Sequence, residues 1–182
     1  MYKAIAATLM CLAGPALATG IQIEVEGEAN GTITIDLLED VAPEHAAQIA
    51  AIAAEGGYDG VVFHRVIEGF MAQTGDVEFG KLGGNMSRAG MGGSARPDLK
   101  AEFSDIPFDR GVVGMARSQN PNSANSQFFI MFAPAPHLNG QYTVVGQVVE
   151  GMDVLDAIRR GSGGNGEVDG EPDVMASVTL VE

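Results

Sequence analysis

The stretch FHRVIEGFMAQTGD, residues 63–76, places Arg65 among apolar side chains, with Gln73 close behind it. A guanidinium needs water or a polar partner, because burying an unpaired charge is costly. Arg65 therefore either extends from a hydrophobic strand into water or is held at the rim of an apolar pocket for a purpose. The apolar pattern indicates two short β-strands in this part of the chain, at Val61–Val66 and Phe70–Gln73.

Further strands are indicated on both sides of this stretch. Apolar and polar residues alternate over 21–26 and again over 33–37, and Asn30-Gly31 between them is a hairpin turn signal. Four more apolar or alternating runs follow, at Val112–Ala116, Gln127–Phe132, Thr143–Val149 and Val174–Val181. Together with the two strands above, they bring the predicted number to eight.

Two helices are predicted between these strands. Pro43 opens the first helix, and Gly56-Gly57 ends it. The second runs from Met152 to Arg160, with Asp153 in its first turn and basic residues in its last, which suits the helix dipole. The strands follow one another too closely for βαβ units. An antiparallel barrel with helices over its ends fits this order best, and a β-sandwich is the alternative.

The first 18 residues have the pattern of a secretory signal peptide, with an N-terminal core helix as the alternative interpretation. Lys3 precedes an apolar run that is too short to span a bilayer, and Ala16-Leu17-Ala18 fits the small-x-small rule for cleavage. We therefore expect a signal peptide at 1–18, a mature domain at 19–182 and a periplasmic location. Cleavage after Ala18 removes Cys11, the only cysteine, so no disulfide or thiol chemistry is expected.

Acidic residues dominate the charge of the chain. Its formal net charge is −14, and residues 19–182 carry −15, because all 24 acidic residues but only nine of the ten basic ones lie there. Such a surface repels nucleic acid and anionic lipid, so neither is expected as a partner of the mature form. His45 and His137 lie far from each other and from any cysteine, so no metal site is expected, and no cofactor either.

Several residues of the predicted strands are expected to be structural. Phe63, Phe128 and Phe132 are interpreted as core residues. His64 is interpreted as a structural histidine with its hydrogen bonds satisfied, rather than as a general base.

Two later blocks extend the pattern of residues 63–76. They are NSANSQFFI, residues 122–130, and LNGQYTVVGQVVEGMDVLDAI, residues 138–158. In order and spacing, the three blocks resemble those of cyclophilins, the peptidyl-prolyl cis–trans isomerases, and the similarity runs from about Gln22 to Val181. The chain most resembles the short bacterial periplasmic members. The resemblance implies a mainly β fold, an eight-stranded antiparallel closed β-barrel capped by two α-helices, in agreement with the periodicity.

The resemblance also implies a role for Arg65. An X-Pro bond isomerises slowly because rotation breaks amide resonance, with a barrier of about 18–20 kcal/mol. In the twisted state the prolyl nitrogen becomes pyramidal and gains a lone pair. A fixed donor over that nitrogen binds the twisted state better than either planar one, and this difference accelerates the reaction. Arg65 matches the catalytic arginine of the family, whose permanent charge needs no proton transfer.

The remaining site residues are implied position by position. The pocket for the proline ring matches Phe70, Met71, Phe129 and Leu138. Gln73 matches a residue that bonds the substrate backbone, and Gln127 matches one that helps orient Arg65.

Four further positions are implied by the resemblance, two of them in the groove on the N-terminal side of the proline. Ala116 and the backbone of Arg117 match the wall that pairs with the peptide. Tyr142 stands where many eukaryotic members carry histidine. His137 stands where drug-sensitive members carry tryptophan, so weak cyclosporin binding is expected.

Two functions of different classes follow from this reading. The first is an isomerase that speeds the folding of exported proteins and acts, as a monomer, on proline-containing unfolded polypeptides. The alternative is a non-catalytic proline-peptide-binding chaperone on the same fold. The presence of the arginine together with the pocket residues favours catalysis, because non-catalytic relatives typically lose the arginine or fill the pocket.

Overall fold

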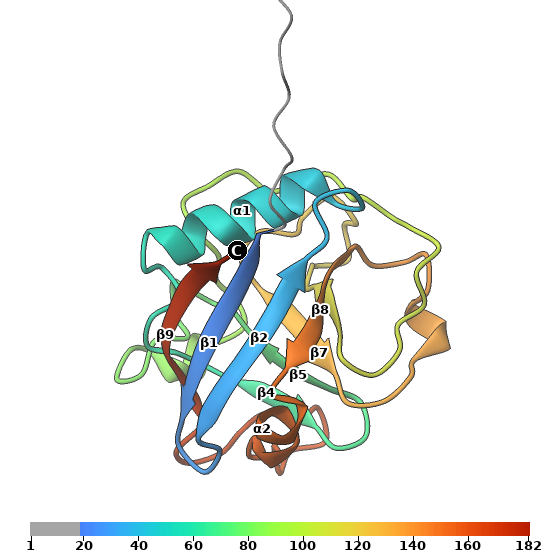
Figure 1. Cartoon of the computed structure of the whole chain (residues 1–182). Helices are drawn as coiled ribbons and strands as arrows, with labels where there is room; N and C mark the ends of the chain where they lie inside the picture. The colour runs from blue at the N-terminus through green and yellow to red at the C-terminus, as the bar shows by residue number, and fades with distance from the viewer. Residues whose placement is uncertain (1–18) are drawn as a thin grey trace, which may run out of the picture.

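One antiparallel sheet of nine strands forms most of the fold in the computed structural model, which describes residues 19–182 (Figure 1). The predicted signal peptide, residues 1–18, lies outside the described residues. The strand order in the sheet is β3-β9-β1-β2-β8-β6-β7-β5-β4. The strands are β1 (Gly20–Glu26), β2 (Gly31–Leu37), β3 (Val61–Val62), β4 (Arg65–Ile67), β5 (Met71–Thr74), β6 (Val112–Met115), β7 (Phe128–Met131), β8 (Val144–Glu150) and β9 (Val174–Val181).

The mainly β, barrel-like class predicted from the sequence is confirmed, with two corrections to its details. The predicted strand Val61–Val66 is two strands, because β3 pairs with β9 whereas β4 pairs with β5. The sheet curls until its two end strands, β3 and β4, are separated by only Phe63 and His64. Among the described residues, no backbone hydrogen-bond ladder joins β3 to β4. The two ends of the curled sheet are therefore connected only through the covalent chain. A single sheet excludes the β-sandwich.

The first hairpin has the predicted strands. The register pairs Ile21 with Ile35 and Val25 with Gly31, so the connection is the four-residue loop 27–30. The Asn30 side chain donates from Nδ2 to the Gly27 carbonyl at 2.8 Å, which closes this loop from within. The predicted hairpin is therefore confirmed, with Gly31 in β2 and with Asn30 acting through its side chain.

The two α-helices lie at opposite ends of the curled sheet (Figure 1). Helix α1 (Pro43–Ala54) has the predicted bounds and buries Ile49 and Ile52 against the sheet. Helix α2 (Met152–Ala157) ends three residues earlier than predicted. Its last turn stops because the residues beyond it bind elsewhere. The Arg159 backbone N–H donates to Asp173, and the Arg160 side chain donates to Glu68 and to the carbonyl of Ile158, the residue that caps the helix end.

Two short 3₁₀ helices lie in the long connections, η1 (Met86–Arg88) and η2 (Pro136–Leu138). Within residues 19–182, no helix is long and apolar enough to cross a membrane.

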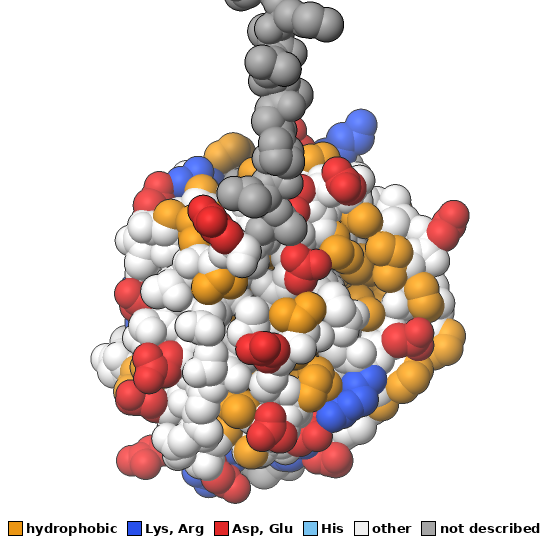
Figure 2. Space-filling view, in the orientation of Figure 1, with side chains coloured by type: hydrophobic (Ala, Val, Ile, Leu, Met, Phe, Trp, Pro, Cys, Tyr) orange, Lys and Arg blue, Asp and Glu red, His pale blue; other side chains and the backbone are white. Residues whose placement is uncertain are grey.

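The apolar interior consists of two clusters. The larger cluster is formed mainly by side chains of the sheet and of α1. It contains the predicted core residues Phe63, Phe128 and Phe132, all confirmed as buried. The smaller cluster is built around Phe108 and Phe129, with Phe70 and Tyr142 packed against it at half-buried positions. Because this second cluster reaches the surface, it supplies an apolar floor for a site. Elsewhere the surface is rich in carboxylates, and Figure 2 shows them scattered over the face formed by α1 and strands β1, β2 and β9.

Candidate active site

Three neighbouring strands bring the central residues of the site together. In β4 and β5, Arg65 pairs with Gln73, and in β5 and β7, Gln73 pairs with Phe129. Partners across antiparallel strands project from the same face of a sheet. Arg65, Gln73 and Phe129 therefore form a row on one face, although Phe129 lies far along the chain.

An open cavity of about 360 Å³ lies beside this row. Ten of the eleven site residues expected from the sequence line it: Arg65, Phe70, Met71, Gln73, Ala116, Arg117, Phe129, His137, Leu138 and Tyr142. The eleventh, Gln127, lines a neighbouring cavity instead. Met71, Phe129 and Leu138 are buried apolar side chains, so this cavity offers an apolar pocket, and two cationic side chains, Arg65 and Arg117, line it as well. We refer to it as the Arg65 pocket.

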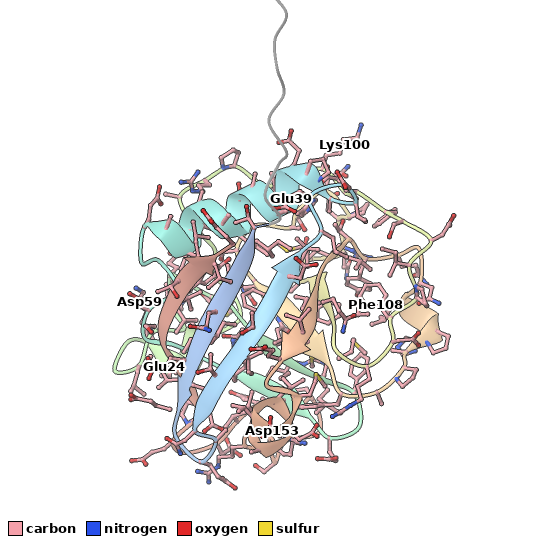
Figure 3. The ribbon with its side chains drawn as sticks, viewed as in Figure 1. Glu24, Glu39, Asp59, Lys100, Phe108 and Asp153 are labelled. Atoms are coloured by element: carbon pink, nitrogen blue, oxygen red, sulfur yellow. The ribbon has the colours of Figure 1, made fainter. Side chains whose placement is uncertain are left out.

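Phe129 is held in place by the predicted site residue Tyr142 and by Phe108, which the sequence did not indicate. Its ring stacks on Phe108, with centroids 5.7 Å apart and planes at 24°, and meets Tyr142 edge-on at 5.7 Å. Figure 3 labels Phe108 on the side of the molecule opposite β9. Gly114 leaves the room that these rings need, because a Cβ there would lie 2.5 Å from Phe129 and 2.6 Å from Phe108. A glycine isolated within a strand was the available signal for such a close approach.

The Arg65 guanidinium is anchored on two sides. Nε donates to the backbone carbonyl of Asn165 at 2.7 Å, and Nη1 donates to Gln73 Oε1 at 3.2 Å. Among the described residues, Nη2 has no hydrogen-bond partner, so its two N–H groups are free to bind a ligand. Partial burial lowers the pKa of Arg65, while Tyr142 raises it. The group remains cationic near neutral pH, because arginine loses its proton only far above that range.

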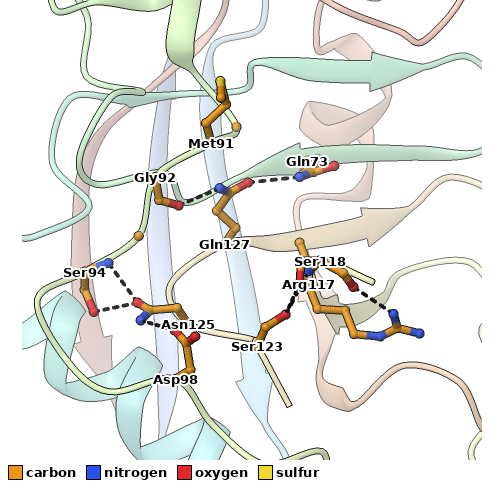
Figure 4. Close-up of a pocket in the computed structure, with 13 residues that line it drawn as sticks. Gln73, Met91, Gly92, Ser94, Asp98, Arg117, Ser118, Ser123, Asn125 and Gln127 are labelled. Atoms are coloured by element: carbon orange, nitrogen blue, oxygen red, sulfur yellow. Dashed lines mark hydrogen bonds between the residues drawn. The ribbon is translucent and has the colours of Figure 1, made fainter. Parts of the chain in front are cut away.

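A chain of amide hydrogen bonds supports Gln73 from behind (Figure 4). Gln73 Nε2 donates to Gln127 Oε1 at 3.0 Å, and Gln127 Nε2 donates to the Gly92 carbonyl at 2.8 Å. Asp76, which is fully buried, accepts backbone N–H groups from Gly90 and Gly92 and so holds the receiving segment. Gln127 thus reaches Arg65 only through Gln73.

A second open cavity of about 590 Å³ adjoins the Arg65 pocket. The two share Gln73, Ala116 and Arg117 as common walls, so together they form one continuous groove. The far side of the second cavity is polar. Asn125 donates to Asp98 Oδ1 at 3.0 Å and accepts from the Ser94 backbone at 2.8 Å (Figure 4).

Two pairs of side chains, Phe70 with His137 and Arg117 with Tyr142, contact each other in the lining of the Arg65 pocket. The exposed His137 ring lies over Phe70, with centroids 5.7 Å apart and planes at 30°. The Arg117 guanidinium lies 4.2 Å from the centroid of the Tyr142 ring and donates to the Gln141 carbonyl. These contacts hold the His137 and Tyr142 rings in the lining of the pocket.

His64, next to Arg65 in the sequence, is buried. Neither ring nitrogen makes a hydrogen bond of good geometry within residues 19–182, and the Val62 backbone is only a weak partner, so the expected hydrogen bonds of this histidine are only partly present. Burial lowers the pKa of His64 to about 4, and the charge of Asp76 offsets only part of that effect. The ring is therefore neutral at pH 7. Within residues 19–182, no three His, Cys, Asp or Glu side chains gather in a metal-binding arrangement.

Comparison with known proteins assigns the chain to a family. The sequence model of "Cyclophilin type peptidyl-prolyl cis-trans isomerase/CLD" matches residues 21–180. A probable peptidyl-prolyl cis-trans isomerase of Brucella suis is 58% identical over 153 residues, covering 83% of this chain and 78% of that protein. Peptidyl-prolyl cis-trans isomerase CYP18-1 of Arabidopsis thaliana is 40% identical over 138 residues, or 75% of this chain and 82% of that one.

Solved structures agree with the fold. A cyclophilin type peptidyl-prolyl cis-trans isomerase of Cryptosporidium parvum has a TM-score of 0.77 at 24% identity, covering 91% of this chain and 99% of that chain. The same protein in the presence of the dipeptide Ala-Pro has a TM-score of 0.74 at 25% identity, covering 90% and 99%. Family match, relatives and fold agree with one another, and the chain therefore belongs to the cyclophilin-type peptidyl-prolyl cis–trans isomerases.

Proposed function

We propose that Arg65 and the apolar pocket beside it carry out the reaction of this family, the cis–trans isomerisation of X-Pro peptide bonds. The observation that carries this proposal is the state of the guanidinium. It is held at Nε and Nη1, and its free Nη2 N–H groups lie at the rim of a pocket lined by Met71, Phe129 and Leu138. A twisting prolyl amide needs two features nearby: an apolar pocket for the proline ring and a fixed cationic donor for the prolyl nitrogen.

In the reaction, the proline ring enters the pocket and loses contact with water. The acyl group on the other side of the bond then turns about the C–N axis, while the ring stays fixed. As resonance is lost, the prolyl nitrogen gains a lone pair, to which Arg65 donates. This hydrogen bond is absent in the planar states, so it lowers the barrier rather than tightening ground-state binding. Exclusion of water by Phe129 and Leu138 strengthens the interaction.

The substrate chain on the N-terminal side of the proline continues along the groove. Gln73, Ala116 and Arg117 lie at the passage from the Arg65 pocket into the second cavity, where backbone and amide groups can pair with a peptide. The relative that was crystallised in the presence of Ala-Pro supports a peptide ligand in this groove. The proposed substrates are therefore proline-containing segments of unfolded polypeptides.

Catalysis is tested against simple peptide binding by one comparison on the purified residues 19–182. The cis-to-trans rate of a short X-Pro peptide is followed with the enzyme at a small fraction of the peptide concentration. A catalyst raises the exchange rate of the whole peptide population at such a ratio. A chaperone that only binds proline peptides affects at most its own equivalent, so an unchanged bulk rate would favour the non-catalytic alternative.

We further propose that the enzyme works in the periplasm, as a monomer, on exported proteins. The support is the charged start, apolar run and Ala16-Leu17-Ala18 site of the first 18 residues. We expect the secreted form to begin at Thr19. N-terminal sequencing of the soluble protein tests this, and a mature protein that still begins at Met1 would refute it. Light scattering that gives the mass of two or more chains would contradict the monomer.

A further inference from the structure

The second anchor of Arg65 comes from a segment 100 residues away in the sequence. The Asn165 carbonyl that accepts from Nε at 2.7 Å belongs to the glycine-rich segment 161–168. We propose that this segment positions the catalytic arginine, and that Gly166 is the residue that sets the place of the Asn165 carbonyl. This inference rests on the catalytic role of Arg65 proposed above and assigns a further positioning residue to the same reaction.

The segment is fastened along β4 on both sides of Asn165. Before it, the Gly161 N–H donates to the Val66 carbonyl at 2.9 Å. After it, the Gly166 carbonyl accepts from the Val66 N–H at 2.7 Å, and the Val168 N–H donates to the His64 carbonyl at 3.1 Å. The carbonyl that holds Arg65 is thus bracketed by three backbone hydrogen bonds to the two neighbours of Arg65. Such bracketing gives it a fixed place relative to the guanidinium.

Only glycine fits at position 166. Its φ is +80°, in the left-handed region that side chains rarely adopt, and it is buried although its neighbour Asn165 is exposed. A Cβ there would lie 2.2 Å from Ile67 Cγ1 and 3.2 Å from the Val66 carbonyl oxygen. Any larger residue must therefore move the segment away from β4, and the Asn165 carbonyl moves with it.

The contact decides which N–H groups of Arg65 face the substrate. A guanidinium has five N–H donors in a rigid fork. With Nε held by Asn165 and one Nη1 N–H held by Gln73, the fork cannot rotate, and the Nη2 edge keeps one direction. A backbone carbonyl does not titrate and has no rotamers, so this anchor costs little ordering when the substrate binds.

Gly166→Ala tests the role, with Gly164→Ala as its matched control. A Cβ at Gly164 meets nothing within 4 Å and its backbone φ is not in the left-handed region, so that variant adds the same methyl group two residues away without strain. We expect Gly166→Ala to lower kcat for an X-Pro peptide by about tenfold or more, since small misplacements of catalytic groups have effects of this size. KM should change less than kcat, and Gly164→Ala should match the wild type.

Combining the change with Arg65→Ala separates positioning from general damage to the fold. If Gly166 acts through Arg65, Gly166→Ala should cause no further loss in an Arg65→Ala background. The same proportional loss in both backgrounds would overturn the inference. So would a normal kcat for Gly166→Ala in an enzyme that Arg65→Ala inactivates, while the proposed function would stand. Full activity of Arg65→Ala would instead overturn the proposed function and this inference with it.

A measurement on the wild type keeps the test decisive even where Gly166→Ala fails to fold. In NMR spectra of the wild-type enzyme, the Arg65 Nε proton should exchange with water at least about tenfold more slowly than that of Arg88. The Arg88 guanidinium lies over the Phe79 ring, and its Nε has no hydrogen-bond partner among the described residues. Equal exchange at the two arginines would show that the Asn165 carbonyl does not hold Nε, and would overturn the inference.

Discussion

Gln73 and Gln127 are joined by a single amide hydrogen bond of 3.0 Å, and this bond links the row of Arg65, Gln73 and Phe129 to the glycine-rich segment 90–93. Each glutamine uses both ends of its amide, so neither can flip without losing two partners. The arginine is thereby held from one side by side chains and from the other by a backbone carbonyl.

Gln127→Ala should release Gln73 from this chain and loosen the Arg65 guanidinium. We expect kcat/KM for an X-Pro peptide to fall by about three- to tenfold, since a net hydrogen bond stabilises by roughly 0.5–1.5 kcal/mol. Steady-state isomerisation assays measure the change. Gln22→Ala, an exposed glutamine on β1, is the matched control and should behave as the wild type. Equal activity of the two variants would show that the chain does not matter to catalysis.

His137→Trp should make the enzyme more sensitive to cyclosporin. The imidazole at the pocket rim stacks on Phe70, and an indole at the same place offers a larger apolar face and an N–H donor. A bulky cyclic ligand should gain more from it than a short peptide whose proline lies deeper. We therefore expect stronger inhibition, with peptide isomerisation changed by less than about tenfold. Paired inhibition and turnover assays check both statements.

Leu180→Trp is the control for this change, because it adds an exposed indole on β9, whose neighbours in the sheet are β3 and β1. It should leave the inhibition of the enzyme unaltered. If His137→Trp is no more sensitive to the drug than Leu180→Trp, the idea that residue 137 contacts the drug is wrong.

His64 should make the protein less stable in mild acid. Its pKa is about 4 in the folded state, against about 6.5 when unfolded, so between these values the unfolded chain binds more protons. The free energy of unfolding therefore falls as the pH drops through this window. Between about pH 7 and about pH 5, protonation of His64 alone should lower the free energy of unfolding of the wild type by about 2 kcal/mol.

Urea unfolding of the wild type and of His64→Leu, at about pH 7 and about pH 5, measures this contribution. Carboxylates titrate in both proteins, so only the difference between their pH dependences belongs to His64. Equal losses of stability in the two proteins would contradict a buried neutral histidine.

Much of the fold could be predicted from the sequence because it follows local side-chain patterns, and the candidate site could be predicted because its residues resemble those of a known family. The alternation around β1 and β2 and the Pro43 start of α1 are local signals, and they appear where expected. Eight of the eleven predicted site residues lie in three continuous blocks, and strand pairing then brings Arg65, Gln73 and Phe129 into one row.

The features that sequence reasoning missed depend on distant contacts. Asn165 contributes a backbone carbonyl, which leaves no mark on residue type, and only the adjacent Gly166 gave any local signal. Helix α2 ends early because Asp173 and Glu68 bind the two arginines that seemed to extend it. In each case a tertiary partner decided the outcome over the local preference.

Arg65 carries the central claim, and its replacement tests that claim most directly. The measurement is kcat/KM of residues 19–182 for cis-to-trans isomerisation of an X-Pro peptide, with Arg65→Ala and Arg65→Lys beside the wild type. Arg88→Ala serves as control, since that arginine is exposed and does not line the groove. We predict a loss of about 10²-fold or more for Arg65→Ala, with an unchanged unfolding midpoint, and a poor Arg65→Lys enzyme, because an ammonium lacks the planar fork. A folded Arg65→Ala variant with wild-type kcat/KM would contradict the account.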